Sequence, residues 1–161
     1  MRKRSKYRPK GVIPDPIKYV LSGVQPVEKS EGGTNLLIIN HDALNNVRLG
    51  RGTRDDIDVL IAAFNMMEAL AILKPELGQD WRVEIRAAQD ALWELGRRGA
   101  ETGKFILRGP ELTAINLGME IHDAQLEKCT VFEMEKAIEY VRSVLRSKQA
   151  RPIVPRKEKV K

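Results

Sequence analysis

The chain has 161 residues, of which 42% are hydrophobic and 31% charged, and its formal net charge is +6. This length and composition suit one folded domain with tails and exclude wholesale disorder. A single cysteine, Cys129, excludes a disulfide framework, and no apolar run is long enough to span a membrane. The cationic N-terminal sequence leads into prolines and an aspartate, so it is not a secretory signal. We therefore expect a basic cytoplasmic protein.

The positive charge is concentrated at the two ends of the sequence. Residues 1–10 carry +6 and residues 146–161 carry +6, whereas residues 11–145 carry −6. We divide the chain into a basic N-terminal arm, a helical domain and a basic C-terminal tail, which span residues 1–14, 15–147 and 148–161. Such basic segments can follow a phosphate backbone without folding first. Solvated tails, or tails that fold back on the acidic body, have the same composition and remain an alternative.

Hydrophobic periodicity predicts an all-α domain, a bundle of about four long helices with one or two short ones. The cap Asp15 and the following proline predict a short helix that ends at Ser22. Residues 23–34 are rich in glycine, proline and serine and are expected to form a surface loop. The long helices are expected over residues 53–73, 80–98, 109–126 and 130–145.

Capping boxes mark the start of two of these helices. Thr53 precedes Asp56 and Thr130 precedes Glu133, with the spacing at which a hydroxyl and a carboxylate cap a helix N-terminus. In residues 57–73, 14 of the 17 residues are apolar, and the three polar ones share an arc of about 80°. This helix is expected to lie at the centre of the core or to be shared with a second copy in a homodimer.

Two short apolar runs cannot be assigned by their period. The run at residues 36–39 is either a buried strand or the first turn of a helix that continues through residues 41–49. A similar run at residues 104–108 precedes the helix expected at residue 109. If both runs are strands, residues 36–39 and 104–108 form a minor two-stranded β-ribbon.

The sequence contains no adequate set of catalytic or metal-binding residues. Its only histidines, His41 and His122, are each followed by an aspartate. Consecutive helical residues point about 100° apart, so neither pair can chelate a metal alone. We expect structural histidines; the alternative is that both meet across the bundle with Asp42 and Asp123. The chain is therefore expected to have no enzymatic activity, no cofactor and no metal.

The segment Gly99–Lys104 (GAETGK) is similar to a phosphate-binding loop, but its glycine spacing is one residue short. We interpret it as a glycine-rich helix end, at which Gly96 and Gly99 stop the helix and Gly103 turns the chain. Cys129 precedes the Thr130 cap and is expected to have a structural role rather than a reactive one.

The candidate functional residues are cations, together with one tyrosine that could stack on a base. Arg97 and Arg98 lie at a helix end, where they are expected to complement the helix dipole. No recognition helix of the helix-turn-helix type is evident, so contacts with the nucleic-acid backbone are expected. The expected nucleic-acid-binding residues are Arg2, Lys3, Arg4, Lys6, Tyr7, Arg8, Lys10, Arg48, Arg51, Arg54, Arg151, Arg156, Lys157 and Lys159.

Residues 1–10 (MRKRSKYRPK) and 51–72 (RGTRDDIDVLIAAFNMMEALAI) resemble small basic α-helical proteins of proteobacterial bacteriophages and prophages, a group with no assigned activity. The resemblance extends through residues 109–126 (GPELTAINLGMEIHDAQL). It implies a phage-related cytoplasmic setting, in which small non-enzymatic proteins often bind nucleic acid or disable a host protein. The leading hypothesis is a non-catalytic protein that binds nucleic acid, DNA in particular. The alternative is an inhibitor or adaptor that binds an acidic host or phage protein through a helical face.

Overall fold

The computed structural model describes residues 21–151, which confirm the all-α prediction. The described part contains five long helices and two short 3₁₀ helices and no β-strand. In chain order they are α2 (Glu31–Arg48), α3 (Arg54–Leu73), η1 (Pro75–Leu77), η2 (Gln79–Trp81), α4 (Arg82–Thr102), α5 (Gly109–Lys128) and α6 (Val131–Arg146). Residues 1–14, most of the helix expected from Asp15, and residues 152–161 lie outside the described residues. None of the helices in the described part is long and apolar enough to cross a membrane.

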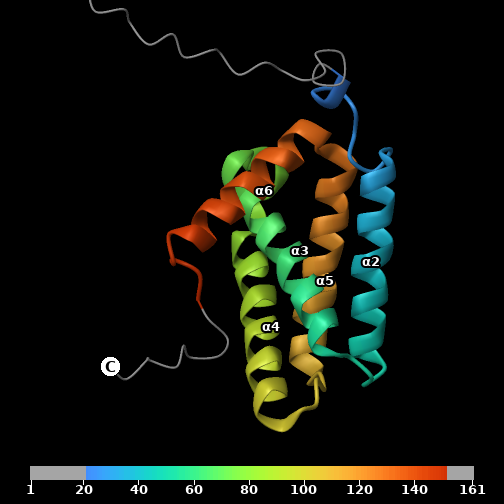
Figure 1. Ribbon diagram of the computed structural model, residues 1–161, viewed down its shortest axis with the longest axis vertical. Coiled ribbons are helices and arrows are strands. Elements are labelled where there is room, and N and C mark those ends of the chain that lie inside the picture. Colours follow the sequence, from blue (N-terminus) through green and yellow to red (C-terminus); the bar gives the residue numbers. More distant parts are fainter. Residues whose placement is uncertain (1–20, 152–161) are drawn as a thin grey trace, which may run out of the picture.

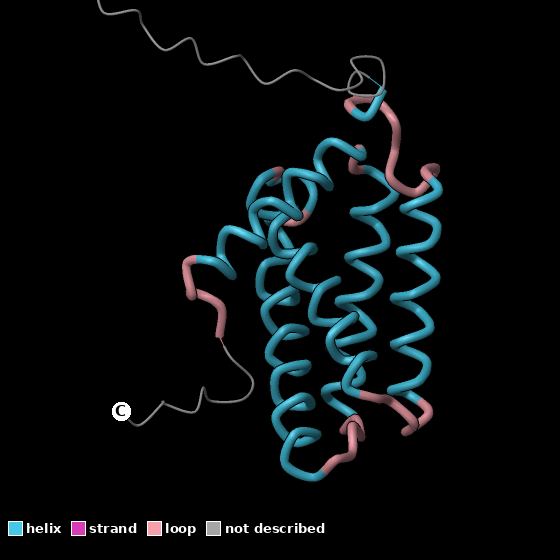
Figure 2. The backbone as a smooth tube through the Cα atoms, viewed as in Figure 1, coloured by secondary structure: helices cyan, strands magenta, loops and turns pink. Residues whose placement is uncertain are grey.

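Helices α2 to α5 form an antiparallel bundle, and α6 crosses obliquely over it (Figure 1). Helix α3 lies at the centre and packs against each of the other four. Because neighbouring helices alternate in direction, the α2–α3 and α4–α5 connections lie at one end of the bundle (Figure 2). We call this the basic end, defined by residues 48–54 and 103–108. The α3–α4 and α5–α6 connections lie at the opposite end.

Both predicted capping boxes are present. The Thr53 hydroxyl accepts a hydrogen bond from the Asp56 N–H at 3.3 Å, and the Thr53 N–H donates to the Asp56 carboxylate at 2.7 Å. Thr130 and Glu133 make the same reciprocal pair, at 3.3 Å and 2.8 Å. The Asp56 carboxylate also accepts from the Asn46 amide at 3.0 Å. This carboxylate therefore joins the end of α2 to the start of α3.

Helix α2 corrects two expectations. Ser30 caps it by accepting a hydrogen bond from the Gly33 N–H at 2.9 Å, so the helix begins inside the expected loop at residues 23–34. Residues 36–39 lie within this helix, and residues 104–108 have no regular secondary structure. The β-ribbon of 36–39 with 104–108 is therefore wrong, and the helical alternative is right. Leu36 and Leu37 pack on the core while the next two isoleucines are exposed, as expected for an amphipathic helix at the edge of a bundle.

The glycines near the end of α4 also differ from expectation. Gly96 and Gly99 lie inside the helix, which continues to Thr102, so they do not stop it. A Cβ atom on Gly99 would lie 2.1 Å from the Phe105 ring, which explains why a glycine is needed there. Gly103 turns the chain as predicted, with a left-handed φ of 72°.

The core is centred on α3, as its apolar sequence predicts. Leu60, Phe64 and Met67 are at most 1% exposed. Phe64 lies where α3, α4 and α5 approach one another, and a Cβ on Gly118 of α5 would lie 2.6 Å from the Ala88 Cβ and 2.9 Å from the Phe64 ring. The interior of a single chain thus accounts for the extent of apolar surface on α3.

Candidate nucleic-acid interface

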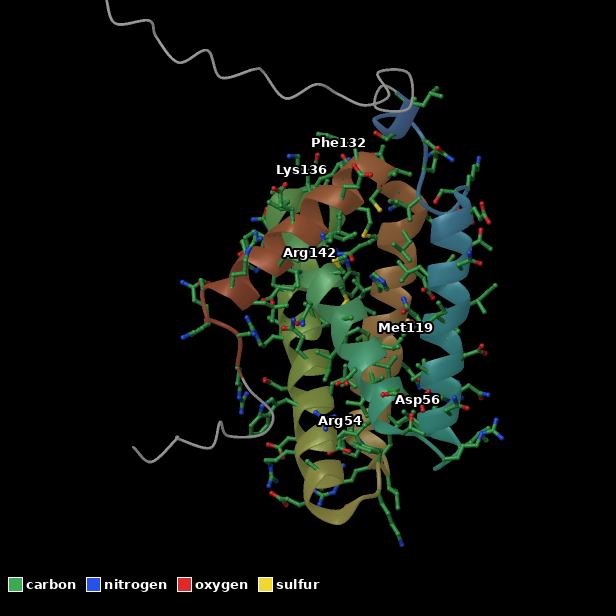
Figure 3. All side chains as sticks on the ribbon, viewed as in Figure 1. Arg54, Asp56, Met119, Phe132, Lys136 and Arg142 are labelled. Carbon is green, nitrogen blue, oxygen red and sulfur yellow. The ribbon has the colours of Figure 1, made fainter. Side chains whose placement is uncertain are left out.

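Three predicted arginines are clustered at the basic end. Arg48 occupies the last turn of α2, Arg51 lies in the connection, and Arg54 begins α3, next to the capping residue Asp56 (Figure 3). Gly50, with a φ of 70°, reverses the chain between the first two. All three arginines are exposed.

These arginines have few carboxylate partners. The Arg54 Nε lies 4.0 Å from the Asp58 carboxylate, and both side chains are largely exposed, so this pair is weak. Within residues 21–151, no carboxylate lies within 4.0 Å of the Arg48 or Arg51 guanidinium. Both guanidinium groups are therefore available to an anionic ligand.

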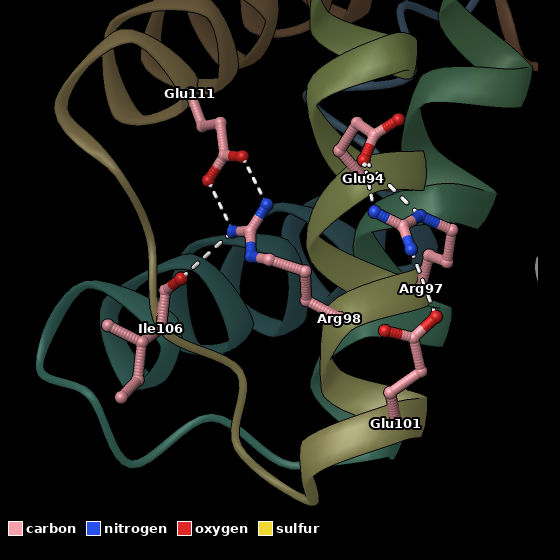
Figure 4. Close-up of polar contacts among 6 residues, drawn as sticks. All are labelled: Glu94, Arg97, Arg98, Glu101, Ile106 and Glu111. Atoms are coloured by element: carbon pink, nitrogen blue, oxygen red, sulfur yellow. Dashed lines mark hydrogen bonds and ion pairs between the residues drawn. The ribbon is translucent and has the colours of Figure 1, made fainter.

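The last turns of α4, next to the α4–α5 connection, contain two arginines that are paired with carboxylates (Figure 4). Arg98 makes a bidentate ion pair with Glu111, at 2.5 Å and 2.6 Å, and also donates to the Ile106 carbonyl at 3.1 Å. Arg97 lies between Glu94 and Glu101, at 3.1 Å and 2.9 Å. Both arginines are thus held by carboxylates, beyond the helix-dipole role that was expected. Arg98 joins α4 to the connection and to α5, whereas both Arg97 pairs lie within α4.

Lys104 and Arg108 are the cations of the α4–α5 connection itself. Both are exposed, and within residues 21–151 neither has a carboxylate within 4.0 Å. The Arg108 backbone N–H donates to Glu111 at 2.9 Å, which ties the end of the connection to the first turn of α5. The basic end therefore presents cations from two connections that are about fifty residues apart in the sequence.

The helix N-termini at the basic end are occupied by the chain's own carboxylates. Burial acts to raise the pKa of Asp56, but hydrogen bonds from Asn46 and Thr53 outweigh it and lower the pKa. Burial likewise opposes the effect of Arg98 and Arg108 on Glu111, whose pKa is also lowered. Because both carboxylates are charged near neutral pH, an incoming phosphate would contact the arginine side chains and not the helix ends.

Arg151 lies away from the basic end, on the flank of α4. Its guanidinium carbon is 3.6 Å from the centre of the Trp93 ring, and its Nη1 is 3.3 Å from the Asp90 carboxylate. Trp93 was not among the predicted functional residues. The sequence gives no local signal for its contact with Arg151, although Arg97, one helical turn later, also lies 5.9 Å from the same ring.

The other predicted contacts lie in the terminal segments, outside the described residues: Arg2, Lys3, Arg4, Lys6, Tyr7, Arg8, Lys10, Arg156, Lys157 and Lys159. The described chain begins at the end of the bundle opposite the basic end. There, the Val27 N–H donates to the Cys129 carbonyl at 3.0 Å, and Pro26 forms an isolated bridge with Thr130. Within residues 21–151, the loop arginines and the start of the described chain do not share one surface.

Only part of the alternative prediction for the histidines agrees with the structure. His41 of α2 pairs with Asp123 of α5 at 2.9 Å, whereas His122 is fully buried and faces the core. Burial lowers the pKa of His122 to about 4, so its ring is neutral at neutral pH. Among the described residues, no group of three or more His, Cys, Asp or Glu side chains could hold a metal. Burial also raises the pKa of Cys129 to about 11, which keeps the thiol protonated and unreactive.

A scan against models of protein families, a search of curated proteins and a search of solved structures each found no match to this chain. At the basic end, four exposed cations have no carboxylate partner among the described residues: Arg48, Arg51, Lys104 and Arg108. The sequence adds two basic terminal segments.

Proposed function

We propose that this protein is a non-catalytic nucleic-acid-binding protein that contacts mainly the phosphate backbone, without base specificity. The observation that carries the proposal is the charge distribution: +12 on 26 terminal residues, against −6 on residues 11–145. Basic segments attached to an acidic body neutralise phosphates, while the acidic surface limits contact between the nucleic acid and the rest of the bundle. DNA in a phage-related setting is the ligand that the sequence resemblance favours.

The exposed cations at the basic end support a second contact region. Arg48 and Arg51 have no carboxylate partner among the described residues, unlike Arg97 and Arg98. Arginine side chains donate several hydrogen bonds in a fixed planar geometry that suits phosphate oxygens. We therefore expect the terminal segments to provide most of the affinity and the basic end to add a smaller part.

Fluorescence anisotropy with a labelled DNA duplex of random sequence, at several salt concentrations, tests the proposal. We compare the full chain with variants that lack residues 1–10, residues 152–161, or both. The chain that lacks residues 152–161 ends at Arg151, so that the contact of Arg151 with Trp93 is retained. Each phosphate that a variant no longer neutralises should reduce the slope of log affinity against log salt by about 0.9. Absence of binding at low salt, or binding that neither deletion weakens, would contradict the proposal.

A matched pair of variants tests the contribution of the basic end. Arg48→Gln/Arg51→Gln removes two cations there, and Lys29→Gln/Lys128→Gln removes two from the opposite end of the bundle. Both changes alter the net charge equally, so a general electrostatic effect would weaken binding equally. We expect the arginine variant alone to reduce the salt slope, by about 0.9 for each phosphate left without its arginine. Equal effects would restrict the interface to the terminal segments.

The alternative function is docking on a host or phage protein. It is supported by several exposed apolar side chains at the end of the bundle opposite the basic end. Ile72, Leu73, Trp81 and Val83 are 37%, 47%, 49% and 78% exposed. A complex formed there would survive moderate salt and deletion of both terminal segments, since it would depend on apolar contacts. Val83→Asp would abolish such a complex and leave DNA binding unchanged, so one variant separates the two functions.

A further inference from the structure

A groove lies between α3, α4 and α6, away from the basic end. It encloses a cavity of about 340 Å³. Its apolar lining includes Phe64 of α3, Trp93 of α4, and Tyr140 and Val144 of α6. The last described residues, Gln149 to Arg151, form one edge of the groove, and the red end of the chain in Figure 1 runs beside α4.

Arg151 is anchored at the rim of this groove. Its guanidinium stacks on the Trp93 ring at 3.6 Å and pairs with Asp90 at 3.3 Å, so one cation satisfies both an aromatic face and a carboxylate. This cation–π distance is well inside the range of about 6 Å over which such contacts are significant. The backbone of the last described residue therefore lies at the edge of an apolar cavity.

The sequence that follows Arg151 matches the groove in chemistry and length. Residues 152–155 are Pro-Ile-Val-Pro, the only apolar stretch in the otherwise basic C-terminal tail. Four extended residues span about 13 Å, enough to cross a cavity of this size. Because the segment is covalently attached beside the groove, its effective concentration there is in the millimolar range, and a weak intrinsic affinity suffices for occupancy.

We propose that this groove is the docking site for residues 152–155 of the same chain, with Arg151 as the anchor and Ile153 and Val154 as the apolar contacts. Docking would fix the point from which the terminal cations Arg156, Lys157 and Lys159 extend, on the flank of α4. The inference does not depend on nucleic-acid binding, and its test contains no nucleic acid.

Tryptophan fluorescence of the full chain tests the docking. In a Trp81→Phe background, Trp93 is the only tryptophan, and acrylamide quenching reports its access to solvent. We compare Ile153→Asp/Val154→Asp with the matched control Lys157→Gln/Lys159→Gln, which changes the net charge equally on the same tail. Losing the burial of one such aliphatic side chain shifts an equilibrium about tenfold or more, so the first variant should open the groove. Its Trp93 should be quenched more strongly and emit at longer wavelength, and the control should match the parent.

Three other outcomes are informative. Quenching that is equal in the parent and the aspartate variant would overturn the proposal, and so would an equal increase in both variants. A difference that depends on protein concentration would assign the groove to the tail of a second copy and overturn docking within one chain. Circular dichroism checks folding, and Ile153→Ser/Val154→Ser replaces the aspartate variant if that variant does not fold.

Discussion

The interior of the bundle and its edge helix α2 are both built from apolar sequence, yet they are held in place differently. In the interior, Leu60, Phe64 and Met67 are at most 1% exposed, and three helices approach closely around Phe64. Helix α2 packs mainly on α3 and α5, and its Ile38 and Ile39 are 56% and 51% exposed. The interior is therefore filled on every side, whereas α2 presents one apolar face to the bundle, with Ala43, Leu44 and Val47 buried, and leaves the opposite face in solvent.

The largest expected effect is that of Phe64→Ala in the interior. Removal of this buried ring should lower the free energy of unfolding by about 3–5 kcal/mol, because it removes apolar contacts and leaves a cavity. Urea unfolding followed by circular dichroism measures the change. Ile38→Ala on the exposed face of α2 is the control and should change stability by less than about 0.5 kcal/mol. Similar losses for the two variants would show that α2 is as tightly integrated as the interior.

The second effect is a loss of stability in acid caused by His122. Burial lowers the pKa of this histidine to about 4, while in the unfolded chain it takes its ordinary value of 6.5. Between these values the unfolded state binds more protons than the folded state, so stability decreases as the pH falls from about 6.5 to 4. The loss should reach about 3 kcal/mol, to be measured by urea unfolding at several pH values.

The variant His122→Met isolates this contribution, since it keeps an apolar side chain of similar size at the same place. Carboxylates with a lowered pKa, including Glu133, also destabilise the protein in acid, and they do so in both forms. The difference between wild type and variant should therefore grow as the pH falls from 6.5 to 4. Parallel curves would show that folding does not lower the pKa of His122, so that the imidazole is protonated in the folded protein at acid pH.

At the edge, two adjacent glycines of α2 are expected to respond in opposite directions. A Cβ on Gly33 would lie 1.8 Å from the Val27 carbonyl oxygen, whereas a Cβ on Gly32 would meet nothing within 4 Å. Gly33→Ala should therefore destabilise the protein by about 1–3 kcal/mol. Gly32→Ala should stabilise it by about 0.5–1 kcal/mol, because alanine favours the helix. Thermal unfolding of the two variants decides; equal behaviour would mean that the start of α2 does not pack on Val27.

These contrasts explain which parts of the fold the sequence predicts. The capping boxes of Thr53 and Thr130 depend on residues three apart, so local spacing is sufficient to find them. The start of α2 was missed because Ser30 precedes a glycine pair, and glycine pairs are typical of loops. Gly33 is required by a contact with Val27, and Gly99 by a contact with Phe105, which no local pattern shows.

The candidate site also has features that the sequence predicts and features that depend on the fold. The exposed arginines near Gly50 are recognisable from composition alone, and the fold keeps them exposed. Which arginines are held by carboxylates depends on pairing across a connection, as for Arg98 with Glu111. The stacking of Arg151 on Trp93 joins residues 58 positions apart in the numbering and has no local sequence signal.

The smallest expected effect concerns the polar contact between α2 and α5. His41 and Asp123 are 51% and 31% exposed at the side chain, so solvent screens their pair at 2.9 Å. A double-mutant cycle of His41→Ala and Asp123→Asn should give a coupling energy of about 0.2–1 kcal/mol, which decreases with added salt. A coupling of several kcal/mol would show that α2 is attached chiefly by this pair. The small value expected here instead assigns its attachment to the apolar contacts of Ala43, Leu44 and Val47, which are at most 5% exposed.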